Sequence, residues 1–207
     1  MWKDNQNIVG DFSVTRVWDT IRPKDAEVSW YSLVWHARCI PEHAFHLWLV
    51  MRKRLKTQDL LRPWDVWDQS SQFVCSLCEL QQDSNDHLFF TCSFSSQVWL
   101  GICSLAGISV NVSDWDSIMA EVIPLSKRKN IESGVTRLVL AASAYFIWQE
   151  RNRRLFSQQR RLSAQLIQEI VSVVRLKLLS FHYKINDRVE HMLGVWKMSV
   201  SLMSSKY

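Results

Sequence analysis

The stretch Cys75-Ser-Leu-Cys78, followed by His87-Leu-Phe-Phe-Thr-Cys92, decides the fold of this chain. Its spacing is C-x2-C-x8-H-x4-C. A C-x2-C turn presents two thiolates to one metal ion at about 2.3 Å, and His87 and Cys92 lie close enough in sequence to complete a tetrahedron. Thiolate and imidazole ligands select zinc over harder cations. The pattern predicts one zinc ion bound by Cys75, Cys78, His87 and Cys92; ordinary buried cysteines are the alternative.

A zinc site with four protein ligands is closed, so no position remains for a substrate or an activated water. We therefore expect a structural ion and no catalytic residues. Zinc binding contributes about 10–16 kcal/mol in zinc-finger peptides, mostly as folding. A second metal site is a further alternative, although surface or core-edge histidines explain its four residues more simply. These residues are His36, Cys39, His43 and His46.

The composition favours a mainly α fold, a helical domain with a small central Cys3His zinc-binding module. The 207 residues include only five Gly and four Pro, whereas folds of many short strands need turn residues every few positions. The chain is 47% hydrophobic and has eleven Trp, which is enough for a real core. With no apolar run long enough to cross a membrane, we expect a soluble, intracellular protein.

Sequence signals divide the chain into three expected regions. Residues 1–40 form a Trp-rich lead-in segment, 41–107 the zinc-binding domain, and 108–207 a C-terminal helical region packed on it. Apolar residues at i, i+3, i+4 and i+7 mark the helices, with capping residues at their ends such as Thr57 and Ser113. Helices are expected at 15–21, after Pro41, at 57–61, after Ser95 up to Gly107, and at 114–122, 131–156, 167–181 and 187–203; a loop or ribbon is expected at 64–73.

Basic residues cluster at three places, and each cluster could contact nucleic-acid phosphates. The net charge of +5 permits such binding without demonstrating it. Solvated helix faces or a favourable position at a helix C-terminus explain the same clusters. The clusters are Arg52-Lys53-Arg54, Lys127-Arg128-Lys129, and Arg151, Arg153 and Arg154 with Arg160-Arg161.

Several stretches in a fixed order resemble one known family over about residues 10–156. They are Gly10-Asp-Phe-Ser-Val14, Ile40-Pro-Glu-His-Ala-Phe-His-Leu-Trp48, the cysteine motif with Val98-Trp99, and Ile147-Trp148-Gln-Glu-Arg-Asn152. This set resembles the reverse-transcriptase zinc-binding domain of plant LINE-type (non-LTR) retrotransposons. The resemblance implies zinc at Cys75, Cys78, His87 and Cys92, contact with RNA or DNA, and a nuclear location.

The resemblance does not extend to polymerase chemistry. Nucleotidyl transfer needs clustered carboxylates that hold two metal ions, and no two acidic residues are adjacent in this sequence. We therefore expect a non-catalytic zinc-binding module that assists RNA or DNA binding and takes no small-molecule substrate. A helical interaction module, with its 167–181 stripe and Trp196 paired to a polymerase domain in trans or to a second copy, is one alternative. An inactive retrotransposon fragment is the other.

Overall fold

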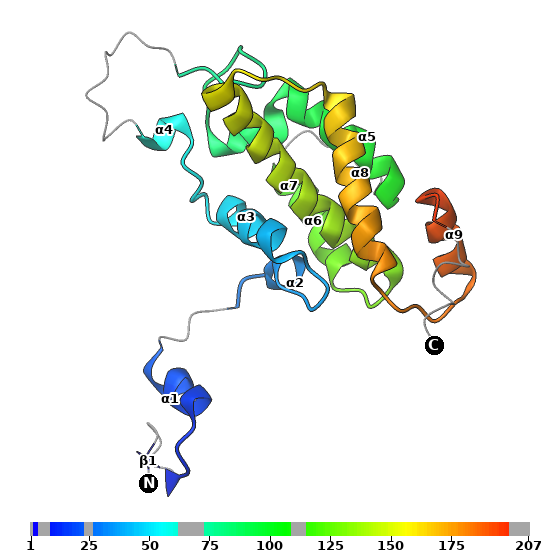
Figure 1. Cartoon of the computed structure of the whole chain (residues 1–207). Coiled ribbons are helices and arrows are strands. Elements are labelled where there is room, and N and C mark those ends of the chain that lie inside the picture. The colour runs from blue at the N-terminus through cyan, green and yellow to red at the C-terminus, as the bar shows by residue number, and fades with distance from the viewer. Residues whose placement is uncertain (1, 4–8, 23–26, 62–72, 109–114, 199–207) are drawn as a thin grey trace.

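The protein is mainly helical, as the sequence predicts. The computed structural model describes residues 2–3, 9–22, 27–61, 73–108 and 115–198 (Figure 1). Within these ranges the elements are β1 (Trp2–Lys3), β2 (Val9–Gly10), α1 (Val14–Ile21), α2 (Tyr31–Val34), α3 (Pro41–Met51), α4 (Gln58–Leu61), the π-helical turn η2 (His87–Thr91), α5 (Ser93–Ala106), α6 (Trp115–Ser126), α7 (Ile131–Ser157), α8 (Ser163–Leu179) and α9 (Asp187–Val195).

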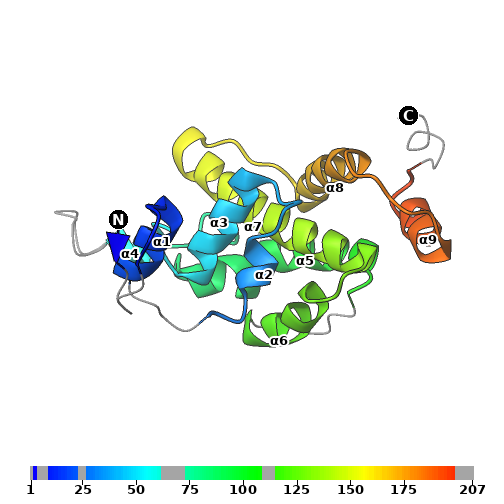
Figure 2. The same cartoon turned by 90° about the horizontal axis from the view of Figure 1, so that it is seen from below.

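Helix α7 is the centre of the molecule. It packs against α2, α3, α5, α6, α8, α9 and η2 (Figures 1 and 2). A helix surrounded by neighbours loses the one-sided apolar stripe of a surface helix, because every face is covered. Its middle carries the small buried residues Ala141, Ala142, Ser143 and Ala144, which let neighbouring backbones approach closely. The sequence Leu138–Gln149 is apolar because it fills the core.

Local signals set most of the helix ends. The side chain of Asn130 accepts a hydrogen bond from the Ser133 backbone N–H and so caps the start of α7. Helix α5 ends at Gly107, whose φ of 65° closes a left-handed C-terminal turn. At α4 the expected cap is wrong: the Gln58 backbone N–H donates to the Asp83 carboxylate, and the Thr57 hydroxyl has no partner among the described residues.

Several elements differ from the sequence expectation or lie outside the described residues. Helix α2 was not predicted, because four residues are too few to show a periodic pattern. Helix α6 continues four residues past the expected end and includes Pro124 near its C-terminus. Helix α9 ends at Val195, earlier than expected. Almost all of the ribbon expected at 64–73 lies outside the described residues, and so does the cap expected at Ser113. The division into regions at residues 40 and 107 stays a prediction.

The apolar stripe of α8 belongs to the protein's own core. Its buried residues face α5 and α7, and Gly101 of α5 lies so close that a Cβ there would meet Ile167 Cδ1 at 2.5 Å. The buried members are Leu166, Ile170, Val171, Val174 and Leu178. Trp196 is also buried, at 1% exposure. Helices of the same chain therefore cover this stripe and Trp196, and pairing with a polymerase domain in trans or with a second copy stays a prediction.

Helix α1 differs from the rest in having no buried residue. Figure 1 shows it apart from the helical body, next to the short β1–β2 pair. Its apolar residues Val14, Trp18 and Ile21 are exposed, as is Phe12 just before it. Across the described residues, every helix is too short or too polar to cross a bilayer.

We expect stability to depend on pH through His43, which is 5% exposed and stacks on Tyr145 with ring centroids 4.5 Å apart. Burial lowers the pKa of His43 from 6.5 to about 4. Between these values the unfolded chain binds more protons, so the free energy of unfolding rises with pH and the gain is complete above 6.5.

Urea unfolding at a series of pH values tests this against His43→Phe, which keeps the stacked ring without the titrating group. The variant should lose less stability than the wild type as pH falls from 6.5 to 4. The exposed control His191→Asn should behave like the wild type, and identical pH profiles for wild type and His43→Phe would contradict the assignment.

Candidate metal centre

Cys75 and Cys78 lie on a tight turn that closes a short hairpin. Val74 pairs with Gln82 in an isolated antiparallel bridge, and the Cys75 backbone N–H donates to the Gln81 carbonyl at 2.7 Å. Glu79 follows with a φ of 58°, and its backbone N–H bonds the Cys75 carbonyl. The turn reverses the chain within a few residues, so both thiols point to the same side.

His87 and Cys92 come from the π-helical turn η2 and the start of α5. The Cys92 backbone N–H donates to the His87 carbonyl at 2.8 Å, a bond that spans five residues. An ordinary α-helical turn would place residues four apart on one face, whereas this wider turn brings His87 and Cys92 together. The H-x4-C spacing is thus the sequence signature of the turn.

The four side chains form one cluster. One ligand atom from each residue lies within 4.8 Å of all the others. The sulfur atoms of Cys75 and Cys92 are 4.0 Å apart, and Cys78 Sγ is 3.2 Å from His87 Nε2. A tetrahedral zinc ion with Zn–S bonds of about 2.3 Å separates its sulfur ligands by about 3.8 Å. The cluster is therefore built to hold one metal ion, and its three sulfurs and one imidazole fit zinc.

Thr91 fixes the histidine for this role. His87 Nδ1 lies 3.1 Å from Thr91 Oγ1, one turn along η2. When Nδ1–H donates to that hydroxyl, Nε2 keeps its lone pair and faces Cys78. Metal-binding histidines commonly anchor their other ring nitrogen in this way. The sequence analysis missed Thr91, although a hydroxyl four residues after a ligand histidine is a readable signal.

The surroundings of Cys92 favour its thiolate form, which is the form that binds a metal ion. A hydrogen bond from Cys75 lowers the pKa of Cys92 to about 5, and the backbone N–H groups of Phe94 and Ser95 at the start of α5 act in the same direction. The Cys92 hydrogen bond and burial raise the pKa of Cys75 instead. One member of the pair is thus readily a thiolate, and a bound cation would stabilise the second, since metal ions displace thiol protons.

A buried ion pair joins the metal cluster to α7. Asp83, at the end of the cysteine hairpin, pairs with Arg151, and both side chains are almost fully buried. The Ser76 hydroxyl between the two cysteines donates to the Arg151 carbonyl at 3.2 Å. Arg151 also lies over the Trp148 ring, 4.8 Å from its centroid. The cysteine hairpin is therefore bonded to α7 through both the side chain and the backbone carbonyl of Arg151.

One turn later, Arg154 extends this connection. Its guanidinium donates to Glu150, to the Leu77 carbonyl between the two cysteines and to the Arg161 carbonyl. Glu150 is fully buried; burial alone would raise its pKa, but hydrogen bonds from Arg154 and Arg161 outweigh this and hold the pKa below its usual value. A carboxylate can be buried in this way when its oxygens accept hydrogen bonds from charged partners.

Arg151 and Arg154 are held inside the fold: their side chains are 3% and 8% exposed and form ion pairs within the chain. Their contact with nucleic acid stays a prediction. The sequence could not distinguish them from Arg153 between them, which is exposed. Arg52, Lys53 and Arg54 are exposed at the end of α3, and Lys53 Nζ lies 2.8 Å from Asp86, the neighbour of His87.

The other candidate ligands do not form a second metal site. They are His36, Cys39, His43 and His46. Within the described residues, only the cluster of Cys75, Cys78, His87 and Cys92 brings three or more His, Cys, Asp or Glu side chains close enough to hold a metal ion. His43 instead stacks on Tyr145, and His46 Nδ1 bonds the Glu42 carbonyl. Cys103 faces the core from α5, as expected for a small buried residue.

Comparison with known proteins agrees with this geometry. Residues 12–99 match the family model described as zinc-binding in reverse transcriptase. The match includes all four cluster residues and is defined by zinc binding. No curated protein and no solved structure matches the chain.

We expect the purified protein to contain one zinc ion per chain, and the double variant Cys75→Ser, Cys78→Ser to lose it. Because zinc binding in small modules is expressed largely as folding, helical circular dichroism and thermal stability should fall in the same variant. Elemental analysis by mass spectrometry gives the zinc content.

The matched control is Cys39→Ser, which removes a thiol outside the cluster and should keep full zinc content. Zinc retained in the double variant, or a folded wild type without zinc, would refute the site.

Loss of the buried ion pair should be costly. Asp83→Ala leaves Arg151 as an unpaired buried charge, and breaking a buried pair typically costs about 3–5 kcal/mol. Glu79→Ala removes the partner of Arg160, but that pair is more than half exposed, so the cost should stay below about 1 kcal/mol. Urea unfolding of both variants measures the difference; similar effects would show that the Asp83 pair is not special.

Proposed function

We propose that this chain is a non-catalytic zinc-binding module, derived from a LINE-type reverse transcriptase of a plant, that assists binding of RNA or DNA. The observation that carries the proposal is the Cys3His cluster inside the segment that matches zinc-binding in reverse transcriptase. A four-ligand site leaves no coordination position for chemistry, so the ion acts by holding the chain in shape. A nuclear location is part of this proposal, since such a module would work where retrotransposed DNA is made.

Exposed cations beside the metal cluster support binding of a polyanion. The Lys53–Asp86 ion pair and a hydrogen bond from the Asn85 amide to the Val50 carbonyl connect the end of α3 to the loop that precedes His87. Zinc would fix this loop, and through it the positions of Arg52 and Arg54. We call Arg52, Arg54 and the exposed Arg153 the zinc-side cations. Fixed cations lose less conformational entropy when they contact phosphates.

Fluorescence anisotropy with a labelled oligonucleotide tests the proposal. The wild type should bind, and its affinity should fall steeply as salt rises, because each phosphate contact releases condensed counterions. The Cys75→Ser, Cys78→Ser variant should bind more weakly. Absence of binding by the zinc-loaded wild type, or binding that salt does not affect, would defeat the proposal.

Helix α1 favours a second candidate function, a protein-interaction module. Phe12, Val14, Trp18 and Ile21 are all exposed, and a contiguous apolar surface of this kind is typical of contact sites. Light scattering over a range of concentrations tests self-association, with Trp18→Ser as the comparison. A monomer at every concentration would count against pairing between copies.

A further inference from the structure

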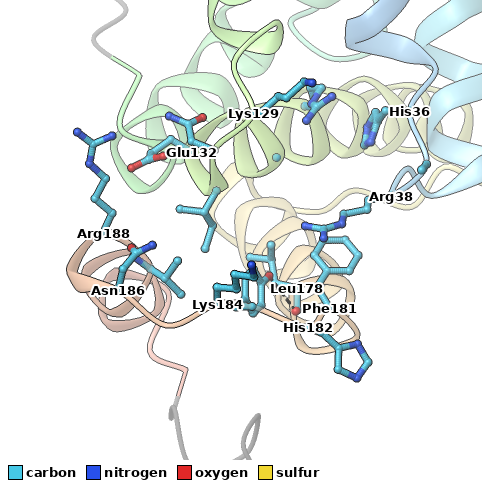
Figure 3. A pocket seen from close by; sticks show the side chains of 17 residues that line it. His36, Arg38, Lys129, Glu132, Leu178, Phe181, His182, Lys184, Asn186 and Arg188 are labelled. Carbon is cyan, nitrogen blue, oxygen red and sulfur yellow. Dashed lines mark hydrogen bonds between the residues drawn. The ribbon is translucent and has the colours of Figure 1, made fainter.

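A deep cleft lies at the end of α7 opposite the metal cluster. Its volume is about 750 Å³. Six segments meet there: the connection between α2 and α3, the loop before α7, the first turns of α7, the last turn of α8, the connection between α8 and α9, and the start of α9 (Figure 3). The metal cluster contacts the last turns of α7, 20 residues further along, so the helix separates the two sites by about 30 Å.

The lining of this cleft is strongly basic. Five cationic side chains line it, against the single carboxylate of Glu132. The cations are Arg38, Lys129, Arg137, Lys184 and Arg188. Their net contribution is +4, whereas the whole chain carries +5, so the charge excess of the protein is concentrated at this one place. A cleft of one charge sign concentrates ligands of the opposite sign.

These cations are not used by the fold. Among the described residues, none of the five forms an ion pair, whereas Arg151, Arg154 and Arg161 near the metal cluster all pair with carboxylates. Arg137 only donates its Nε–H to the Ser133 carbonyl, and Arg38 lies over the Phe181 ring at 4.9 Å. Unpaired guanidinium groups are suited to phosphate oxygens, which match their planar donor geometry.

The positive charges that line the cleft repel one another when no anion is bound. Burial and then the nearby Arg38 charge lower the pKa of Arg137. Burial, Arg137 and Lys177 together lower the pKa of His36 to about 4. In each case repulsion from neighbouring cations adds to the larger effect of burial, and a bound anion would offset that repulsion.

We propose that this cleft binds the sugar–phosphate backbone of single-stranded nucleic acid. The inference rests on the nucleic-acid binding proposed above and assigns it a site built mostly of residues that follow the segment matching the zinc-binding family. A cleft of this volume is in the range of small-molecule sites, a size that matches a few nucleotides of a single strand. The Tyr183 ring in its lining offers a surface on which a base can stack, whereas Arg38 and Lys177 lie against the Phe181 ring.

The test compares two triple variants with the same change of net charge. The cleft variant is Lys129→Glu, Lys184→Glu, Arg188→Glu, all at exposed positions around the cleft. The zinc-side variant is Arg52→Glu, Arg54→Glu, Arg153→Glu. Both should keep wild-type zinc content and circular dichroism, because none of the six side chains is buried or ion-paired among the described residues.

Binding of a labelled single-stranded oligonucleotide is then measured by anisotropy at several salt concentrations. The cleft variant should lose at least about tenfold in affinity at low salt, and its salt slope should shrink by about two, since each lost single-strand contact contributes about 0.7. The zinc-side variant should lose less. Ultraviolet cross-linking of the wild type should map to the peptide that contains Phe181 and Tyr183.

The outcomes separate this inference from the function it rests on. If the wild type binds and the cleft variant binds equally well, the cleft assignment is wrong and the proposed function stands. If an unlabelled duplex competes as well as a single strand, the single-strand assignment is overturned. If the wild type binds no nucleic acid, both the cleft assignment and the proposed function are wrong.

Discussion

The requirement that three sulfurs and one imidazole nitrogen meet around one point shapes the middle of this protein. Cys75 and Cys78 meet it through a tight hairpin turn, and His87 and Cys92 through a turn closed by a five-residue hydrogen bond. Both turns are unusual backbone conformations that a bare chain has little reason to adopt. A shared metal ion gives that reason, because its binding free energy is expressed as folding.

The metal cluster would remain a local feature without the polar connection to α7. Asp83 links three parts at once: it accepts from the start of α4, closes the hairpin, and pairs with Arg151. Arg154 adds a bond to the carbonyl between the two cysteines. Charged groups buried in this manner need fixed partners. The zinc-binding segment and the helical region are therefore one structural unit, and the arginines between them are structural.

The distribution of charge follows from the same packing. Near the metal cluster, Arg151, Arg154 and Arg161 pair with carboxylates, whereas Arg52, Arg54 and Arg153 are exposed. At the other end of α7, five cations from separate segments surround a cleft with one carboxylate. The metal cluster and the basic cleft lie at opposite ends of α7. One end can therefore maintain the fold while the other contacts a polyanion.

The sequence alone determined the helical class, most helix positions and the four cluster residues, because periodicity, caps and ligand spacing are local properties of the chain. It could also have revealed Thr91, which stands four residues after His87. It could not tell Arg151 and Arg154 from Arg153, since their burial depends on Asp83 and Leu77, which are far away in sequence. The basic cleft was equally hidden: its cations come from five separate segments, and only tertiary packing brings them together.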